Sequence, residues 1–260
     1  MTRYDCIGGT YNNTRVADDR IVDMFVRLLG LHDGALIADI GAGTGNYAAA
    51  LAGRGYRVMA VEPSSAIYRQ VTPSSLIEWL PALAEQLPLD DASVSGIISI
   101  LSVHHFDDQE RAFDEMARIS PFGPIVILTF DPRVGQETWL TDYFATIWAN
   151  AFKVFPPIHD VAGLLEKATG REVETIPLQI PHDLMDNFAA AGWRNPHRYL
   201  SASFRENIRA FRLADQAAIT REIVRLSKDL ADGTWERRYS QVLQLDEIDA
   251  GYRFLRVFPA

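Results

Sequence analysis

The stretch from Ala35 to Ser64 constrains the fold of this chain more than any other. It opens with an apolar run to Ile40 that contains one acid, Asp39, as expected for a buried parallel strand that leads into a turn. The next apolar run, Val58 to Val61, is again followed by an acid, Glu62. A glycine-rich turn and an alanine-rich segment at helical spacing lie between the two runs. The stretch therefore predicts a strand–turn–helix–strand unit of the kind that binds nucleotides.

The spacing of the glycines in this turn distinguishes between two kinds of ligand. Gly41, Gly43 and Gly45 follow a G-x-G-x-G pattern. Glycine adopts backbone dihedrals closed to other residues and lets a ligand approach without meeting a Cβ atom. A dinucleotide fingerprint is G-x-G-x-x-G, and Asn46 stands where its third glycine belongs. The pattern therefore does not favour a pyrophosphate.

The two acids, Asp39 and Glu62, indicate which chemical groups the ligand carries. Asp39 beside the turn would repel a phosphate but suits an ammonium group. Glu62 follows Gly41 at about the 20-residue offset at which an acid reaches ribose hydroxyls in such units. A ligand with a ribose, no phosphate and an amino-acid zwitterion is S-adenosylmethionine (SAM). The run Asp39–Gly45, DIGAGTG, resembles motif I of class I SAM-dependent methyltransferases, and Glu62 is similar to the acid after their second strand. A glycine-rich turn in another α/β protein is the alternative.

Two later motifs extend this resemblance. The segment Ala84–Leu89, AEQLPL, is similar to the one after strand three of the ubiquinone- and menaquinone-type C-methyltransferases, although Leu83 replaces their usual aspartate. The resemblance implies adenine contacts from the backbone of Ala84 and the side chain of Glu85; a polar turn cap is the alternative. His104 and His105 resemble the histidine pair after strand four. Either could be a general base near neutral pH, or could serve packing or capping.

The resemblance also implies further contacts to SAM. N-terminal tyrosines and an arginine often close over the cofactor in these enzymes, which points to Tyr11 and Arg15; an ordinary surface arm is the alternative. Pro63 directly follows the second-strand acid, Glu62, and Ser102 lies just before the histidine pair. We expect both residues in the cofactor site.

Composition limits the partners and the compartment. The net charge is −9 and the pI about 5.1, so a general attraction to nucleic acid or to anionic membrane is not supported. Cys6 is the only cysteine, which excludes an internal disulfide and a cysteine-based zinc site. The sequence begins without an apolar signal core and has no apolar run long enough for a membrane span. We expect a cytoplasmic protein without a metal site.

The predicted fold class is α/β, a Rossmann-like sheet of seven mostly parallel strands with helices on both faces. The resemblance places the last strand antiparallel between strands five and six. We expect a core of residues 1–181 and 249–260, including an N-terminal arm, and a helical insert or lid over 182–248. A helix over 63–71 and a single aromatic-rich helix over 138–152 are also expected, the latter as core packing or as an acceptor-pocket wall. The predicted strands are 35–40, 58–61, 76–80, 96–101, 125–130, 172–180 and 251–258.

The combined motifs predict a SAM-dependent methyltransferase that acts on a small molecule through an oxygen, nitrogen or carbon nucleophile. The resemblance is to the group of ubiquinone/menaquinone C-methyltransferases and malonyl-carrier O-methyltransferases. A non-catalytic SAM-binding regulator and a NAD-dependent oxidoreductase are the alternatives. A homodimer is compatible with the sequence.

Overall fold

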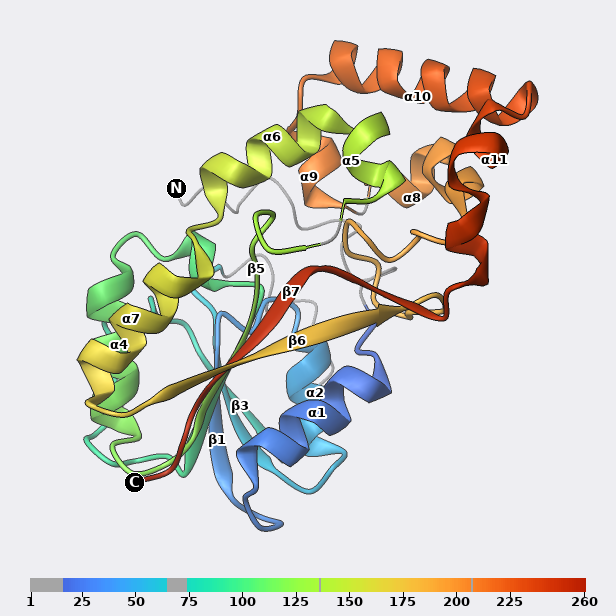
Figure 1. Cartoon of the computed structure of the whole chain (residues 1–260). Coiled ribbons are helices and arrows are strands. Elements are labelled where there is room, and N and C mark those ends of the chain that lie inside the picture. The colour runs from blue at the N-terminus through green and yellow to red at the C-terminus, as the bar shows by residue number, and fades with distance from the viewer. Residues whose placement is uncertain (1–15, 65–73, 136, 207) are drawn as a thin grey trace.

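A seven-stranded sheet runs through the molecule in the order β3-β2-β1-β4-β5-β7-β6 (Figure 1). The computed structural model describes residues 16–64, 74–135, 137–206 and 208–260. The expected N-terminal arm, with Tyr11 and Arg15, and most of the expected helix over 63–71 lie outside these residues. The strands are β1 (Leu36–Ile40), β2 (Arg57–Val61), β3 (Ile77–Leu80), β4 (Gly96–Ile100), β5 (Ile125–Phe130), β6 (Val173–Pro181) and β7 (Glu247–Val257).

The strand directions confirm the predicted sheet. The pairs β1–β2, β2–β3, β1–β4 and β4–β5 are parallel. Strand β7 lies between β5 and β6 and is antiparallel to both. The strand order reverses between β1 and β4, and ligands of open α/β sheets bind outside the carboxyl ends of the strands at such a switch point. The glycine turn after β1 lies at this point.

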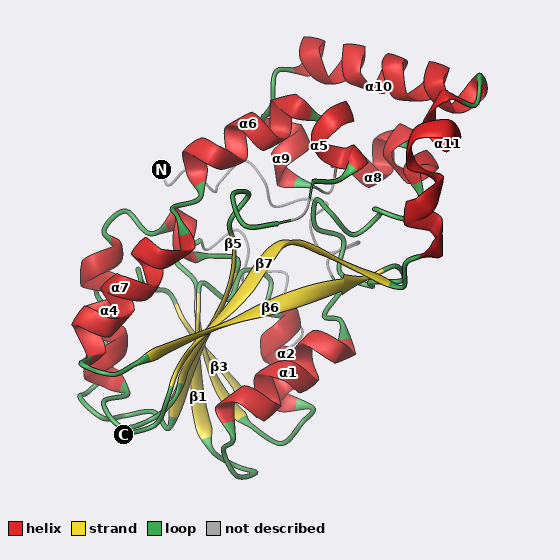
Figure 2. Ribbon diagram, viewed as in Figure 1, coloured by secondary structure: helices red, strands yellow, loops and turns green. Residues whose placement is uncertain are grey.

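Helices cover both faces of the sheet (Figure 2). On one face are α1 (Asp19–Leu29) and α2 (Asn46–Ala52), and on the other α4 (Gln109–Ile119) and α7 (Ile158–Thr169). Helix α1 illustrates why these helices pack on the sheet. Its apolar residues recur at helical spacing and form one face, on which Ile21, Phe25 and Leu28 are all buried. Gly30 ends the helix in the left-handed region, with φ 61°.

A third layer of helices lies beyond the carboxyl ends of the parallel strands (Figure 1). Its aromatic side chains share one apolar cluster with α1 and α2, so the layer is continuous with the core. The buried aromatics of the layer include Trp139, Tyr143, Phe144, Trp193, Tyr199, Phe211 and Trp235. The helices are α5 (Trp139–Tyr143), α6 (Ala145–Val154), α8 (Ala202–Glu206), α9 (Arg209–Leu213), α10 (Gln216–Ala231) and α11 (Thr234–Tyr239).

Two expectations about this layer require correction. The single helix expected over 138–152 is two helices, because the chain leaves helical geometry at Phe144, with φ −116° and ψ 47°. The Phe144 ring packs against Tyr199 and Phe211 from the later part of the chain, a tertiary contact that the local pattern does not contain. Residues 182–195, expected within a mostly helical insert, form turns and loop instead.

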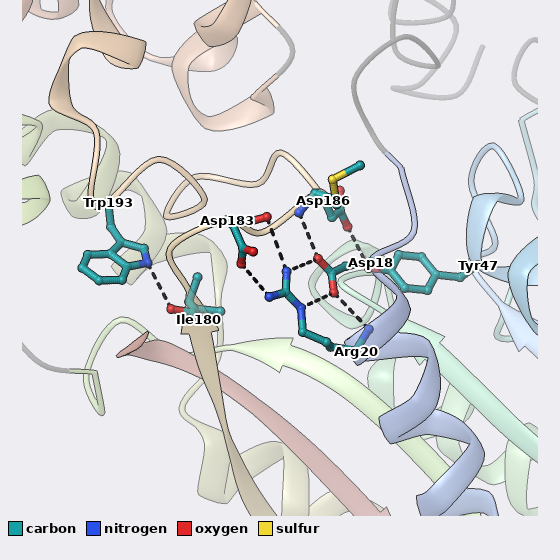
Figure 3. A network of polar contacts seen from close by, with 8 residues as sticks. Asp18, Arg20, Tyr47, Ile180, Asp183, Asp186 and Trp193 are labelled. Atoms are coloured by element: carbon teal, nitrogen blue, oxygen red, sulfur yellow. Dashed lines mark hydrogen bonds and ion pairs between the residues drawn. The ribbon is translucent and has the colours of Figure 1, made fainter. Parts of the chain in front are cut away.

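The loop after β6 is held against α1 and α2 by polar contacts that range from exposed to buried (Figure 3). Asp18 caps α1 and also accepts a hydrogen bond from the backbone N–H of Met185, at 2.9 Å. Arg20 joins Asp18 to the Asp183 carboxylate, at 2.8 and 2.6 Å. The Tyr47 hydroxyl of α2 donates to Asp186 at 2.9 Å. The segment that leads into the insert is therefore held against the core.

We expect Asp18→Ala to destabilise the protein more than a capping substitution elsewhere. Loss of an N-cap costs about 1 kcal/mol, and loss of the part-buried hydrogen bond from the Met185 N–H to the Asp18 carboxylate adds about 1–3 kcal/mol. Asp215→Ala is the matched control, since exposed Asp215 caps α10 through Ala217 alone. Denaturant unfolding measures both, and equal losses of unfolding free energy would contradict the role of Asp18.

Candidate functional site

The glycine turn after β1 adopts the conformation that only glycine tolerates well. Gly41, Gly43 and Gly45 have φ values of 77°, 55° and 77°, in the left-handed region. The backbone N–H groups of Gly41 and Ala42 both donate to the carbonyl of Val61, at 2.9 Å, which ties the turn to the end of β2. The turn is thereby held at the carboxyl edge of the sheet.

The three glycines are required for different reasons. A Cβ atom on Gly41 would lie 2.5 Å from the Cβ of Ser102, and one on Gly45 would lie 2.6 Å from the Trp79 ring. The protein itself therefore leaves no room for a side chain at either of these two positions. Among the residues that the structure describes, a Cβ on Gly43 would meet nothing within 4 Å. Gly43 is thus the position of the turn where the backbone faces open space that a ligand could fill.

Glu62 joins the end of β2 to the glycine turn. Its carboxylate accepts hydrogen bonds from the backbone N–H groups of Gly43 and Ser64, each at 3.0 Å. Burial raises its pKa, and the two backbone hydrogen bonds oppose that rise. A carboxylate offers about four lone-pair sites, and donors among the described residues use two of them. Glu62 can therefore accept hydrogen bonds from a pair of hydroxyl groups while it holds the turn.

Asp39 is the second carboxylate of this site. It is 1% exposed, and its Oδ1 has no hydrogen-bond partner among the described residues. Burial, together with the charge of Glu62, raises the pKa of Asp39 to about 7. A buried carboxylate with an unpaired oxygen is costly unless a cationic or donor group meets it. The pair Asp39 and Glu62 therefore suits a ligand with an ammonium group and hydroxyls, and disfavours a phosphate.

The chain makes a strained turn after β4. Leu101 has φ 50°, which is uncommon for a residue with a branched side chain. The next residue, Ser102, donates from its hydroxyl to the carbonyl of Ile40 at 3.0 Å and lies 2.5 Å from the Ser99 hydroxyl. Ser102 thus packs against Gly41 and supports the glycine turn. Its expected contact with the cofactor remains a prediction.

His104 and His105 follow in a short 3-10 helix, Val103–His105. Their ring centroids are 3.7 Å apart, and the His104 ring also packs on Phe155, at 4.1 Å. Burial lowers the pKa of His105 to about 4, with a further contribution from Arg209, and places that of His104 well below the usual value. Both imidazoles are therefore neutral near pH 7. A pKa this low makes them weaker bases than the sequence suggested, and their catalytic role remains a prediction.

The other predicted positions lie around this edge of the sheet. The Glu85 carboxylate accepts hydrogen bonds from the backbone N–H groups of Asp107 and Asp108, at 2.7 and 3.2 Å, so it fixes the start of α4. This matches the turn-cap alternative, and its adenine contact remains a prediction. Ala84 is buried, and Pro63 lies half-buried between Glu62 and Ser64. The cofactor contacts expected of Ala84 and Pro63 are likewise untested.

Some residues of this region could not be found from sequence. Trp79 closes over Gly45, Phe155 packs on His104, and Arg209 acts on both histidines from the distant helix α9. Nothing near these residues in the chain marks them. Among the described residues, no three or more metal-binding side chains are grouped as a metal site. None of the described helices combines the length and apolar character that a bilayer span requires.

Comparison with known proteins identifies the family. Residues 38–127 match the family model described as a methyltransferase domain. A crystal structure from Anabaena variabilis, of a provisionally assigned methyltransferase from an antibiotic biosynthesis pathway, is 48% identical. It superposes with a TM-score of 0.92 over 95% of this chain and 99% of its own. The chain belongs to the class I SAM-dependent methyltransferases.

More distant relatives agree with this membership. An uncharacterised methyltransferase of Mycobacterium tuberculosis is 29% identical over 163 residues, which are 60% of this chain and 64% of the relative. The ubiquinone/menaquinone C-methyltransferase of Rubrivivax gelatinosus is 33% identical over 123 residues, 46% of this chain and 48% of its own length. The matched regions thus span less than two thirds of these curated relatives. The cofactor that this methyltransferase family implies is SAM.

The open space at Gly43 leads to a prediction about cofactor binding. Gly43→Val should abolish binding of SAM and of S-adenosylhomocysteine (SAH), because the added side chain would occupy the ligand's path. Gly170→Val is the matched control, since Gly170 also has a positive φ, 66°, and open space, but lies at the end of α7. We expect similar thermal destabilisation in both variants. Unchanged SAH affinity in Gly43→Val, measured by isothermal titration, would contradict the assignment.

Glu62 can be tested by a substitution that keeps its shape. Glu62→Gln should weaken SAH binding by about 1–3 kcal/mol, the usual range for hydrogen bonds to a charged group. Glu78→Gln, on the exposed side of β3, is the control and should bind as the unaltered protein does. A loss too small to measure in the calorimeter would mean that Glu62 does not meet the ribose.

The raised pKa of Asp39 predicts a pH dependence of cofactor affinity. The ammonium group prefers the ionised carboxylate, which prevails above a pKa of about 7 and is lost as the pH falls. SAH affinity should therefore rise about eightfold from roughly pH 6 to 7.5, the ratio of ionised fractions for such a group. Asp39→Asn should bind more weakly and lose most of this dependence. An equally steep profile in the variant would assign it to another group.

Proposed function

We propose that this protein transfers the methyl group of SAM to a small-molecule acceptor. The observation that carries the proposal is the arrangement of Asp39 and Glu62 around the open backbone of Gly43. One carboxylate has an oxygen without a partner, the other retains lone pairs, and the glycine between them leaves room for a ligand. These three features suit the zwitterion and the ribose of SAM together.

Each of these residues has a distinct part in holding the donor. Asp39 would meet the ammonium group of the methionine moiety, and Glu62 would accept hydrogen bonds from the ribose hydroxyls. Gly43 lets the backbone approach without a side chain in the way. Bound SAM would supply a methyl group that the sulfonium already activates. The chain then has to align the acceptor for in-line displacement, and such positioning contributes several kcal/mol.

The acceptor side of the site is built from the ends of β4 and β5. His104, His105 and Phe155 form one packed group there. Phe130 at the end of β5 packs on Phe155, with centroids 5.1 Å apart, and continues this wall. The neutral imidazoles would position the acceptor through hydrogen bonds and exclude water, in place of the general-base role that the sequence suggested. The helical layer over 182–248, as a lid, would close the site from above.

A small-molecule acceptor in a cytoplasmic setting agrees with several properties of the chain. The excess of acidic residues opposes binding to nucleic acid. The Anabaena protein that matches nearly the whole chain is assigned to an antibiotic biosynthesis pathway, which we take as support for a small-molecule acceptor here.

The alternatives make different demands on the site. A NAD-dependent oxidoreductase would place a pyrophosphate at the glycine turn, where the two buried carboxylates would repel it. A non-catalytic SAM-binding regulator would use the same donor residues without transferring the methyl group. Binding and transfer must therefore be measured separately.

The experiment has two stages. Isothermal titration with SAM, SAH and NAD should show micromolar binding of the first two and none of the third. Transfer of a radiolabelled methyl group from SAM to a panel of small molecules then tests catalysis. Binding of NAD alone would overturn the proposal. Tight SAH binding without transfer to any class of acceptor would favour the regulator.

A further inference from the structure

The loop between β6 and the third layer of helices carries an inference about how the donor site and that layer are linked. The inference rests on the proposed function because it concerns the same donor site. We propose that Tyr47 and Asp186 are a positioning pair for SAM. Through their hydrogen bond the loop over 182–195 holds the glycine turn in its binding conformation, and bound SAM in turn holds the loop in place.

One end of this link is built into the glycine turn. The backbone N–H of Gly45 donates to the carbonyl of Ala42 at 2.9 Å, and the N–H of Ala49 donates to the carbonyl of Gly45 at 2.8 Å. The glycine turn and the first turn of α2 are therefore one hydrogen-bonded unit. Tyr47 is the second residue of that helix. A displacement of Tyr47 would thus move the turn that carries Gly43.

The Tyr47 side chain is fixed both at its ring and at its hydroxyl. The ring packs edge-on against Phe25 of α1, with centroids 6.4 Å apart, and Phe25 packs on Phe254 of β7 at 5.1 Å. The hydroxyl donates to the Asp186 carboxylate at 2.9 Å (Figure 3). Both side chains are buried, Asp186 with only 1% of its surface exposed. Water competes little with a hydrogen bond in such surroundings, so this contact can fix the loop and the helix relative to each other.

The loop depends on such contacts for its position. Residues 182–195 form turns and irregular backbone instead of a helix or strand. The first part of the loop is held by the contacts to α1 and α2 described above. In its last part, the Trp193 indole donates to the carbonyl of Ile180 at 3.0 Å, and the Trp193 carbonyl accepts from the Trp139 indole of α5 at 2.6 Å (Figure 3). The loop therefore connects the helix of the donor turn to the third layer.

Thermodynamic linkage makes this connection act in both directions. A contact that favours the binding conformation of the turn raises the affinity for SAM, and bound SAM must then stabilise the contact by the same factor. Coupling of this kind usually changes an affinity by about 5- to 150-fold. A protein loaded with SAM would thus hold the third layer more firmly than the free protein. The acceptor would meet an ordered site once the donor is bound.

Tyr47→Phe tests the pair because it removes the hydroxyl and keeps the ring. SAH affinity, measured by isothermal titration, should fall at least about fivefold, the lower end of the usual range for coupled sites. Hydrogen–deuterium exchange measures the other direction of the link. SAH should slow exchange of the backbone amides of residues 182–195 in the unaltered protein, and should not slow it in Tyr47→Phe. A contact that only stabilises the fold would leave this response to SAH intact.

Tyr143→Phe is the matched control. The Tyr143 hydroxyl also donates to a carboxylate, that of Asp229 at 2.8 Å, but it joins α5 to α10 within the third layer. We expect the two phenylalanine variants to lose similar unfolding free energy, and Tyr143→Phe to bind SAH as the unaltered protein does. Asp186→Asn keeps an oxygen acceptor for Tyr47 and should retain most of the affinity.

The possible results separate this inference from the proposed function. Unchanged SAH affinity in Tyr47→Phe, or equal losses of affinity in both phenylalanine variants, would overturn the inference. So would an exchange response to SAH that persists in Tyr47→Phe. Intact SAH binding that leaves the exchange of residues 182–195 unchanged in the unaltered protein would count against the inference alone. Failure of the unaltered protein to bind SAH would overturn the proposed function and this inference with it.

Discussion

The proximity of two buried carboxylates, Asp39 and Glu62, is the constraint around which this site is organised. Asp39 lies near the end of β1 and Glu62 directly follows β2, and the carboxyl ends of these adjacent parallel strands meet at one edge of the sheet. Burial and mutual repulsion raise the pKa of Asp39 to about 7. The fold opposes this cost with two backbone N–H groups directed at Glu62, but gives no such partner to the Oδ1 of Asp39. A strained or under-satisfied group of this kind is commonly found where a protein binds its ligand.

The three glycines of the turn meet two different requirements, packing within the protein and room for a ligand. Gly41 and Gly45 are required because Ser102 and Trp79 lie against them, so both serve the architecture of the turn. Gly43 faces open space and hydrogen-bonds to Glu62. The motif therefore contains two glycines that packing requires, Gly41 and Gly45, on either side of one glycine that faces the expected ligand, Gly43.

Sequence predicted the sheet well because its signals are local. Apolar runs that end in turns located all seven strands, and the family resemblance correctly placed β7 between β5 and β6. The break at Phe144 was missed because it depends on rings contributed by Tyr199 and Phe211, far along the chain. The same holds for the site. Glu62 and the glycines carry a recognisable spacing, whereas the electrostatic effect of Arg209 on the histidine pair comes from a helix about a hundred residues further along the chain. The low pKa of the histidines likewise follows from burial, which their sequence neighbours do not reveal.

A crystal structure of the protein grown with SAH would show directly whether Asp39 and Glu62 hold the cofactor. We predict that the ammonium group of SAH lies within hydrogen-bond distance of Asp39 Oδ1, with the ribose hydroxyls at Glu62 and the backbone of Gly43 beside the ligand. SAH bound elsewhere, or bound at the turn with its ammonium group away from Asp39, would contradict the role proposed for the two carboxylates.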